Sequence, residues 1–160
     1  MIGATAYDWW LFIHIVGVLG FVMAHGTSAG VAFQLRHERN PDRIRALLQL
    51  STSSTSVFYL SILVLLVAGV VMGFRGHWWS QGWIWTALIV LFATMGAMYA
   101  VATPYYRRVR RIMQIQESGS QAVGPDEIEQ VMREGRPGVI TLLGAIPLLF
   151  IVYLMVIKPY

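Results

Sequence analysis

Near its N-terminus the chain reads WWLFIHIVGVLGFVMAHGTSAGVAFQL over residues 9–35, without a single Asp, Glu, Lys or Arg. A helix needs roughly 20 apolar residues to cross the hydrocarbon core of a bilayer, and this segment is long enough. Strands of a membrane β-barrel would be shorter and would alternate in polarity. The run is also too long for the apolar part of a signal peptide and lacks a basic start. We therefore interpret it as a mature transmembrane helix.

Three further segments have the same character: residues 55–74, 83–103 and 139–157. Of the 160 residues, 56% are hydrophobic and only 12% are charged, about half the charged share of an ordinary soluble domain. The sequence predicts an all-α fold, an integral membrane four-helix bundle that forms one four-span domain over residues 1–160. The expected partner of this domain is the lipid bilayer, in which its four spans are embedded. The absence of cysteine excludes disulfides, thiolate metal sites and cysteine nucleophiles.

Charge and aromatic residues predict the orientation of the bundle. Ten of the twelve Lys and Arg side chains lie in the connections that follow the first and third spans. Tryptophans gather at the opposite ends of the spans. Since cytoplasmic loops are rich in Lys and Arg and aromatic rings prefer the interface, we expect a multi-pass protein of the bacterial inner membrane with both termini periplasmic or extracellular. The basic run 107–111 directly follows a span, so we expect it to meet anionic lipid and not nucleic acid.

The bundle is expected to carry cytoplasmic helical extensions. Asn40-Pro41-Asp42 is typical of a helix start, because Asn caps, Pro suits the first turn and Asp suits the positive end of the dipole. The second helix should therefore begin well before its membrane part. The third should continue past Pro104 to Ser118, and residues 125–134 should form a short helix.

Small residues at four-residue spacing predict close helix packing, within one bundle or in a homodimer. The pairs are Gly26 and Gly30, Gly69 and Gly73, and Gly96 and Ala100.

Two histidines, His14 and His25, lie in the first span. An ionisable residue inside a span is costly and marks a functional site by default. Eleven residues separate the two, which places them about 20° apart in azimuth and roughly 16 Å apart along the helix axis. They cannot ligate one metal ion together, but each can hold its own centre.

Haem iron takes axial His or Met ligands. His77 or Met72 is a candidate second ligand for His14, and Met95 or Met98 for His25. A flat macrocycle needs small residues where it lies against a helix. We expect four glycines of the first span to provide this space: Gly17, Gly20, Gly26 and Gly30. The alternative is that each histidine only donates a hydrogen bond to a neighbouring helix, for which the candidate acceptors are Ser61, Thr86 and Tyr99.

Other chemistry is scarce in this sequence. No predicted span contains Asp or Glu, which argues against a transporter built on carboxylates. We find no P-loop, GxGxxG, GxSxG or HExxH motif. Whether the protein is an enzyme therefore stays open at this point.

Residues 10–17, WLFIHIVG, resemble the W-L-x-x-L-H-x-x-G opening of several small bacterial membrane proteins. These are the copper-resistance D-type domain, the HemJ-type protoporphyrinogen oxidase and a four-helix predicted membrane family related to both, which agrees best in length and helix count. The resemblance to the HemJ type implies haem b bound through His14. The resemblance to the copper type implies a metal role at the same position.

The leading hypothesis is an inner-membrane b-type haem-binding protein with an electron-transfer or haem-dependent redox role, served by a redox partner or quinone. Its cofactor-binding candidates are His14, His25 and His77, with iron held by His14 and His25. Two alternatives stay open. One is a membrane copper-handling protein, with His14, Met23, His25, Met72 and His77 as ligands. The other is a non-enzymatic membrane scaffold.

Overall fold

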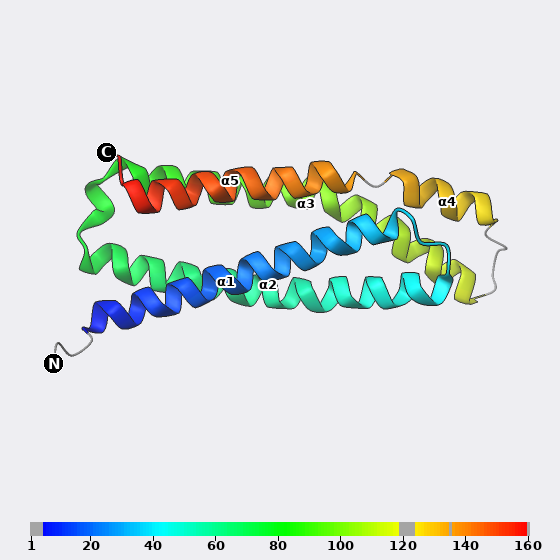
Figure 1. Ribbon diagram of the computed structural model, residues 1–160, viewed down its shortest axis with the longest axis horizontal. Helices are drawn as coiled ribbons and strands as arrows, with labels where there is room; N and C mark the ends of the chain where they lie inside the picture. The colour runs from blue at the N-terminus through cyan, green and yellow to red at the C-terminus, as the bar shows by residue number, and fades with distance from the viewer. Residues whose placement is uncertain (1–4, 119–123, 135, 160) are drawn as a thin grey trace.

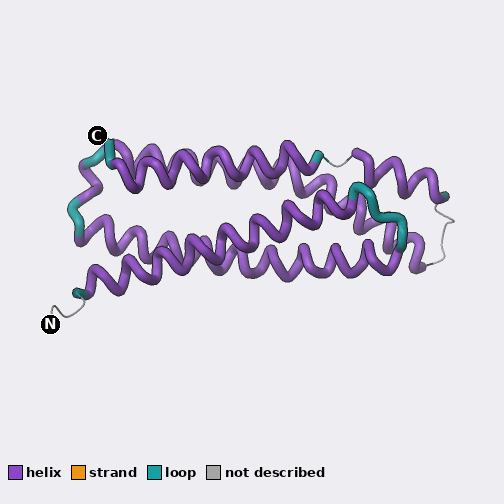
Figure 2. Tube along the Cα trace, viewed as in Figure 1, coloured by secondary structure: helices purple, strands orange, loops and turns teal. Residues whose placement is uncertain are grey.

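The computed structural model describes residues 5–118, 124–134 and 136–159, and these residues form helices joined by short connections (Figures 1 and 2). The elements in chain order are α1 (Ala6–Leu35), α2 (Pro41–Arg75), the 3-10 turn η1 (Trp78–Ser80), α3 (Gly82–Ser118), α4 (Pro125–Glu134) and α5 (Pro137–Ile157). Four helices are long and apolar enough to cross a membrane. The predicted all-α fold with four long apolar helices is confirmed.

The helix ends follow the local signals in the sequence. The side chain of Asn40 accepts hydrogen bonds from the backbone N–H groups of Asp42 at 2.9 Å and Arg43 at 3.3 Å, so α2 begins at Pro41 as predicted. Helix α3 continues through Pro104 to Ser118. The turn η1 was not anticipated.

The long helices form two pairs. Helix α1 packs chiefly on α2, and α3 chiefly on α5, with fewer contacts between the pairs. Small and hydroxyl side chains line the α1–α2 contact: the Ser54 hydroxyl donates to the Ala24 carbonyl at 2.7 Å, and Gly17 lies directly against Leu65. A Cβ at Gly20 would lie 2.5 Å from the Ser61 hydroxyl oxygen. Gly17 and Gly20 therefore serve helix packing, and the expectation that they make room for a macrocycle is wrong.

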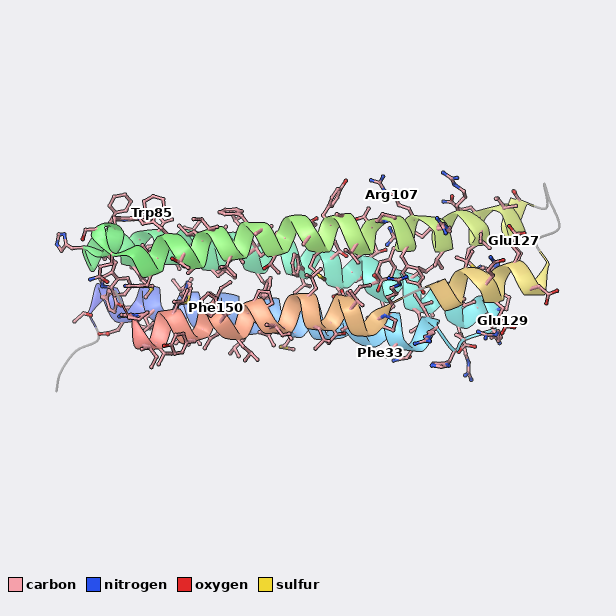
Figure 3. All side chains as sticks on the ribbon, turned by 90° about the horizontal axis from the view of Figure 1, so that it is seen from above. Phe33, Trp85, Arg107, Glu127, Glu129 and Phe150 are labelled. Atoms are coloured by element: carbon pink, nitrogen blue, oxygen red, sulfur yellow. The ribbon has the colours of Figure 1, made fainter. Side chains whose placement is uncertain are left out.

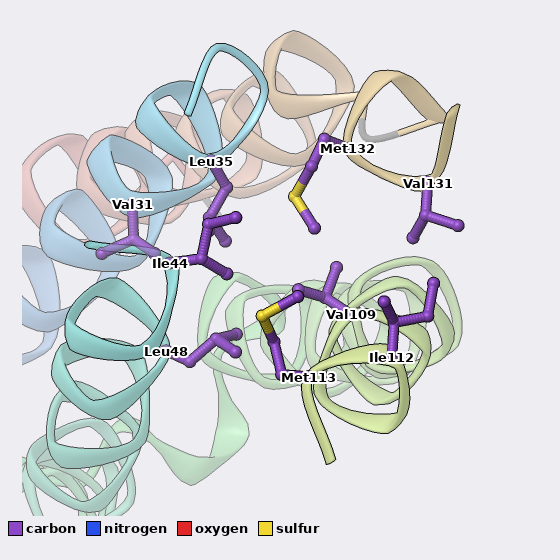
Figure 4. Close-up of a cluster of buried hydrophobic side chains, with 9 residues drawn as sticks. All are labelled: Val31, Leu35, Ile44, Leu48, Val109, Ile112, Met113, Val131 and Met132. Atoms are coloured by element: carbon purple, nitrogen blue, oxygen red, sulfur yellow. The ribbon is translucent and has the colours of Figure 1, made fainter. Parts of the chain in front are cut away.

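The two pairs are joined firmly at the end that carries the α1–α2 connection and α4, which we call the arginine end. Nine buried side chains from α1, α2, α3 and α4 form one cluster there (Figure 4): Val31, Leu35, Ile44, Leu48, Val109, Ile112, Met113, Val131 and Met132. An ion pair between Arg39 and Glu129, with a nitrogen–oxygen distance of 3.2 Å, ties the α1–α2 connection to α4. Figure 3 shows Glu127 and Glu129 at this end and Arg107 on the same half of the molecule.

The opposite end, where α1 begins and α5 ends, we call the tryptophan end (Figure 1). Trp78, Trp79, Trp83 and Trp85 lie in η1 and the first turn of α3, and Trp85 marks this end in Figure 3. The buried cluster here belongs to the second pair only: Trp83, Ile84, Ala87, Ile151 and Leu154. The first pair is not part of it, so space is left between the pairs at this end.

The small-residue pairs have different outcomes. Gly69 packs against His14 and Gly73 against Trp79. Among the described residues, no other part of the chain comes within 4 Å of the position that a Cβ would take at Gly26, Gly30 or Gly96. Packing inside the bundle thus explains only the pair on α2.

Candidate functional site: the cavity beside His14

His14 is held by a backbone group of the neighbouring helix. Its Nδ1 lies 2.8 Å from the carbonyl oxygen of Leu65 on α2. A carbonyl oxygen can only accept a hydrogen bond, so Nδ1 carries the proton and donates it. In the neutral imidazole this leaves the lone pair on Nε2 free. The sequence had suggested Ser61, Thr86 or Tyr99 as acceptors, but the observed one is the main chain.

Gly69 of α2, one turn after Leu65, lies beside this ring. A Cβ at Gly69 would lie 3.4 Å from both Nδ1 and Cε1 of His14. Any larger side chain there would extend into the space beside the imidazole. The glycine and the carbonyl of Leu65 together orient the ring.

His14 lines a cavity of about 310 Å³ between the two helix pairs. The walls come from α1, α2, η1, α3 and α5 and are mostly apolar. This volume lies at the lower end of the range of small-molecule sites, about 300–1,000 Å³. Within the described lining, His14 is the one imidazole, and Met72 and Met155 supply the two thioethers.

The cavity ends in a polar rim at the tryptophan end. The ammonium of Lys158 lies 4.1 Å from the ring centroid of Trp78 and 5.8 Å from that of Trp83, both within the reach of a cation–π contact. The Trp85 indole donates to the Trp79 carbonyl at 2.9 Å. The indole N–H of Trp79 itself is buried against Gly73, with no hydrogen-bond partner in the part of the chain that the structure describes.

His25 lies in a second and much smaller site. It lines a cavity of about 20 Å³ together with Met95 and Met98, the two methionines that the sequence placed at its level. Its ring packs against Gly144 of α5, where any Cβ would collide with it. Its Nε2 is buried and has no hydrogen-bond partner of good geometry among the described residues, although the ring interacts with the backbone of Thr141 on α5. A space of this size holds about one water molecule.

The structure separates the remaining candidates from these two sites. His77 is exposed in the α2–α3 connection with φ of 55°, and it does not line the cavity beside His14. Met23 is 71% exposed on α1. His14 and Met72 thus share one cavity, His25 lies in another, and His77 and Met23 lie in neither. The described residues also contain no group of three or more His, Asp or Glu side chains able to hold a metal ion.

Comparison with known families decides what kind of protein this is. The sequence model of the family described as "Predicted integral membrane protein (DUF2269)" matches residues 10–159. The chain belongs to this family. It is a multi-pass integral membrane protein with four spans. There is no significant match among curated proteins or solved structures.

Three parts of the site were missed in the sequence. The Leu65 carbonyl has no sequence signature, because every residue has a carbonyl. Gly69 was noticed only as one of a packing pair. Lys158 is one of the two basic residues outside the connections that follow the first and third spans, and only the tertiary structure brings it to the rim of the cavity.

Proposed function

We propose that this member of the DUF2269 family binds one haem b in the cavity beside His14, with Nε2 of His14 as the axial ligand, and that its role is electron transfer or a haem-dependent oxidation. The observation that carries the proposal is the hydrogen bond from Nδ1 of His14 to the Leu65 carbonyl. Histidines that ligate metals typically donate their other ring N–H to a carbonyl or carboxylate, which fixes the tautomer and the ring orientation.

The cavity residues fit a haem in three respects. The walls are apolar, as a macrocycle requires. Gly69 keeps the space beside the imidazole clear. Met72 and Met155 line the same cavity, and a thioether is a known axial ligand. The resemblance of residues 10–17 to the HemJ type supports the same assignment.

When bound, haem b supplies one-electron redox chemistry. The chain's own contribution is to hold the ligand nitrogen in one tautomer, to exclude water with apolar walls and to keep the site near one face of the membrane. Exchange of electrons with a quinone or a protein redox partner would take place at that face.

We propose a single haem and not two. The cavity beside His25, at about 20 Å³, is too small for a macrocycle. His25 therefore packs against α5 and binds nothing larger than water or a single ion.

The tryptophan end is proposed to face the periplasm or the outside. Most of the positive charge lies at or near the arginine end, and such charge favours the cytoplasmic side. A reporter enzyme that works only outside the cytoplasm, fused to the C-terminus, should be active. If the C-terminal fusion is inactive and a fusion inserted in the α1–α2 connection is active, the protein has the opposite orientation in the membrane.

An absorption spectrum of the detergent-purified protein tests the haem assignment. We expect a Soret band that shifts on reduction with dithionite. His14→Ala should abolish it, because a methyl group cannot replace an imidazole–iron bond. His77→Ala is the matched control, since it removes an imidazole from the same end but outside the cavity, and the band should persist.

Each other outcome has a definite meaning. Loss of the band in His77→Ala alone would make His77 the ligand. Unchanged haem content in His14→Ala would overturn the proposal. Stoichiometric copper without a Soret band would support the copper-handling alternative, and neither pigment nor copper would support the scaffold. If a haem is present, Met72→Leu and Met155→Leu show which thioether, if either, is the second ligand.

A further inference from the structure

The rim of the cavity carries a cation but no acid. Lys158 lines the cavity, whereas no Asp or Glu does so within the part of the chain that the structure describes. The other basic side chain near this end, Arg75 in the last turn of α2, is not part of the lining. The indole N–H of Trp79 is buried against Gly73 of α2 and does not face the cavity. A ligand that fills this cavity therefore meets the Lys158 ammonium at the rim and has to bring the acceptor.

The backbone at Lys158 indicates that its side chain matters. It ends α5 with φ of 49° and ψ of 60°, a left-handed conformation. Glycine is the usual residue in that conformation, because a Cβ is disfavoured there. The chain has a lysine instead, and the left-handed turn brings its ammonium over the Trp78 ring.

The spacing along the bundle suits a ligand that reaches from His14 to this rim. Trp78, which lies under the Lys158 ammonium, also contacts Tyr7 on α1, with ring centroids 6.0 Å apart. Tyr7 and His14 are seven residues apart on the same helix, a rise of about 10 Å. This is comparable with the distance between the iron and the carboxylates at the propionate edge of a haem.

We infer that Lys158 is the carboxylate-binding residue of this cavity, so that the propionate edge of the ligand held by His14 faces the tryptophan end. The inference rests on the proposed haem function and adds the orientation of the group. It also predicts that the protein recognises the carboxylate groups of the ligand as well as its macrocycle.

Two ligands and four proteins test it. Protein purified without haem is titrated in detergent with haem b and with its dimethyl ester, which lacks the carboxylate charges, and the dissociation constants are read from the Soret absorbance. The proteins are the wild type, Lys158→Gln, Lys158→Arg and Arg75→Gln. The last is the matched control, because it removes one positive charge from the same end outside the cavity.

Because Lys158 is exposed, we expect Lys158→Gln to weaken haem binding about 2- to 5-fold, as for an exposed charge pair, and to leave binding of the ester unchanged. Lys158→Arg should keep wild-type affinity, and Arg75→Gln should have no effect. Equal weakening of haem and ester would mean that Lys158 acts on the structure of the rim and would overturn the inference. So would an unchanged affinity for haem in Lys158→Gln. A wild-type protein that binds neither ligand would instead refute the proposed function itself.

Discussion

The two ends of this bundle are built on opposite principles. At the arginine end, four helices including the short α4 close around one buried cluster (Figure 4). At the tryptophan end, the buried cluster belongs to α3 and α5 alone, and a cavity of about 310 Å³ separates them from α1 and α2.

The difference follows from what surrounds the helices at each end, water at the arginine end and lipid at the tryptophan end. Val109 lies within the basic run of α3 and Ile112 and Met113 directly follow it, beyond the apolar part of the helix, so the arginine-end cluster can be buried from water. In lipid there is no such driving force between helices, because the surrounding tails are as apolar as the side chains. A cavity therefore costs less where the helices face lipid, and the chain can keep one there for a ligand.

Truncation of a leucine at each end tests this contrast most strongly. Leu35 is fully buried in the arginine-end cluster, and Leu35→Ala should lower the free energy of unfolding by about 2–5 kcal/mol. Leu88 is half-buried and lines the cavity, so Leu88→Ala should cost about 1 kcal/mol or less. Unfolding in mixed micelles, followed by circular dichroism, measures both. Equal losses would remove the distinction between the ends.

Glycine substitutions on α1 give the next largest expected effect. A Cβ at Gly17 would lie 2.9 Å from the backbone nitrogen of Leu65, and Gly17→Ala should push α1 and α2 apart at a cost of about 1–3 kcal/mol. No other part of the described chain lies within 4 Å of the position that a Cβ would take at Gly26, so Gly26→Ala should raise stability by about 0.5–1 kcal/mol through helix propensity. The same unfolding assay serves, and a destabilised Gly26→Ala protein would indicate a partner packed on that face, such as a second copy of the chain.

Filling the cavity should affect binding more than folding. Gly69→Leu places a branched side chain beside the His14 imidazole, and we expect haem affinity to fall about tenfold or more, the equivalent of the 1–3 kcal/mol that overpacking typically costs. Gly96→Leu is the control, because no other described segment lies within 4 Å of the position that a Cβ would take there. A Soret titration of both variants measures the difference. Wild-type affinity in Gly69→Leu would place the haem elsewhere.

The smallest predicted effect concerns pH at the arginine end. The backbone N–H groups of Asn40 and Arg39, each 2.9 Å from the Glu38 carboxylate, lower the pKa of Glu38 from its ordinary value of 4.5, and the Arg43 charge lowers it further. Because the pKa of Glu38 is lower in the folded protein than in the unfolded chain, its carboxylate stabilises the folded state in full above pH 4.5. This stabilisation is lost as the pH falls through the pKa of Glu38 in the folded protein. Glu38→Gln should remove this part of the acid dependence of unfolding. An identical acid profile in the variant would show that the connection contributes nothing.

Much of the fold was readable from local patterns. Apolar runs predicted the four long helices, and Asn40 with Pro41 predicted where α2 begins. The short helix α4 also matches its predicted bounds. These features depend on neighbouring residues and on whether a segment favours lipid or water, and both can be read from the local sequence. The histidine spacing on α1 also indicated that the two rings cannot ligate one metal ion together, and in the structure they line different cavities.

The site itself depended on contacts between distant segments. The acceptor for His14 is a backbone carbonyl 51 residues away in the chain, and no side-chain pattern identifies a particular carbonyl. Gly17 and Gly20 were assigned to a macrocycle, but the pairing of α1 with α2 uses them for packing, whereas Gly69 opens the space beside His14. His77 was grouped with His14 by its level in the membrane, yet the left-handed turn that starts η1 leaves it exposed. A sequence gives the depth of a residue along a helix, but which helix faces which follows from the packing of the whole bundle.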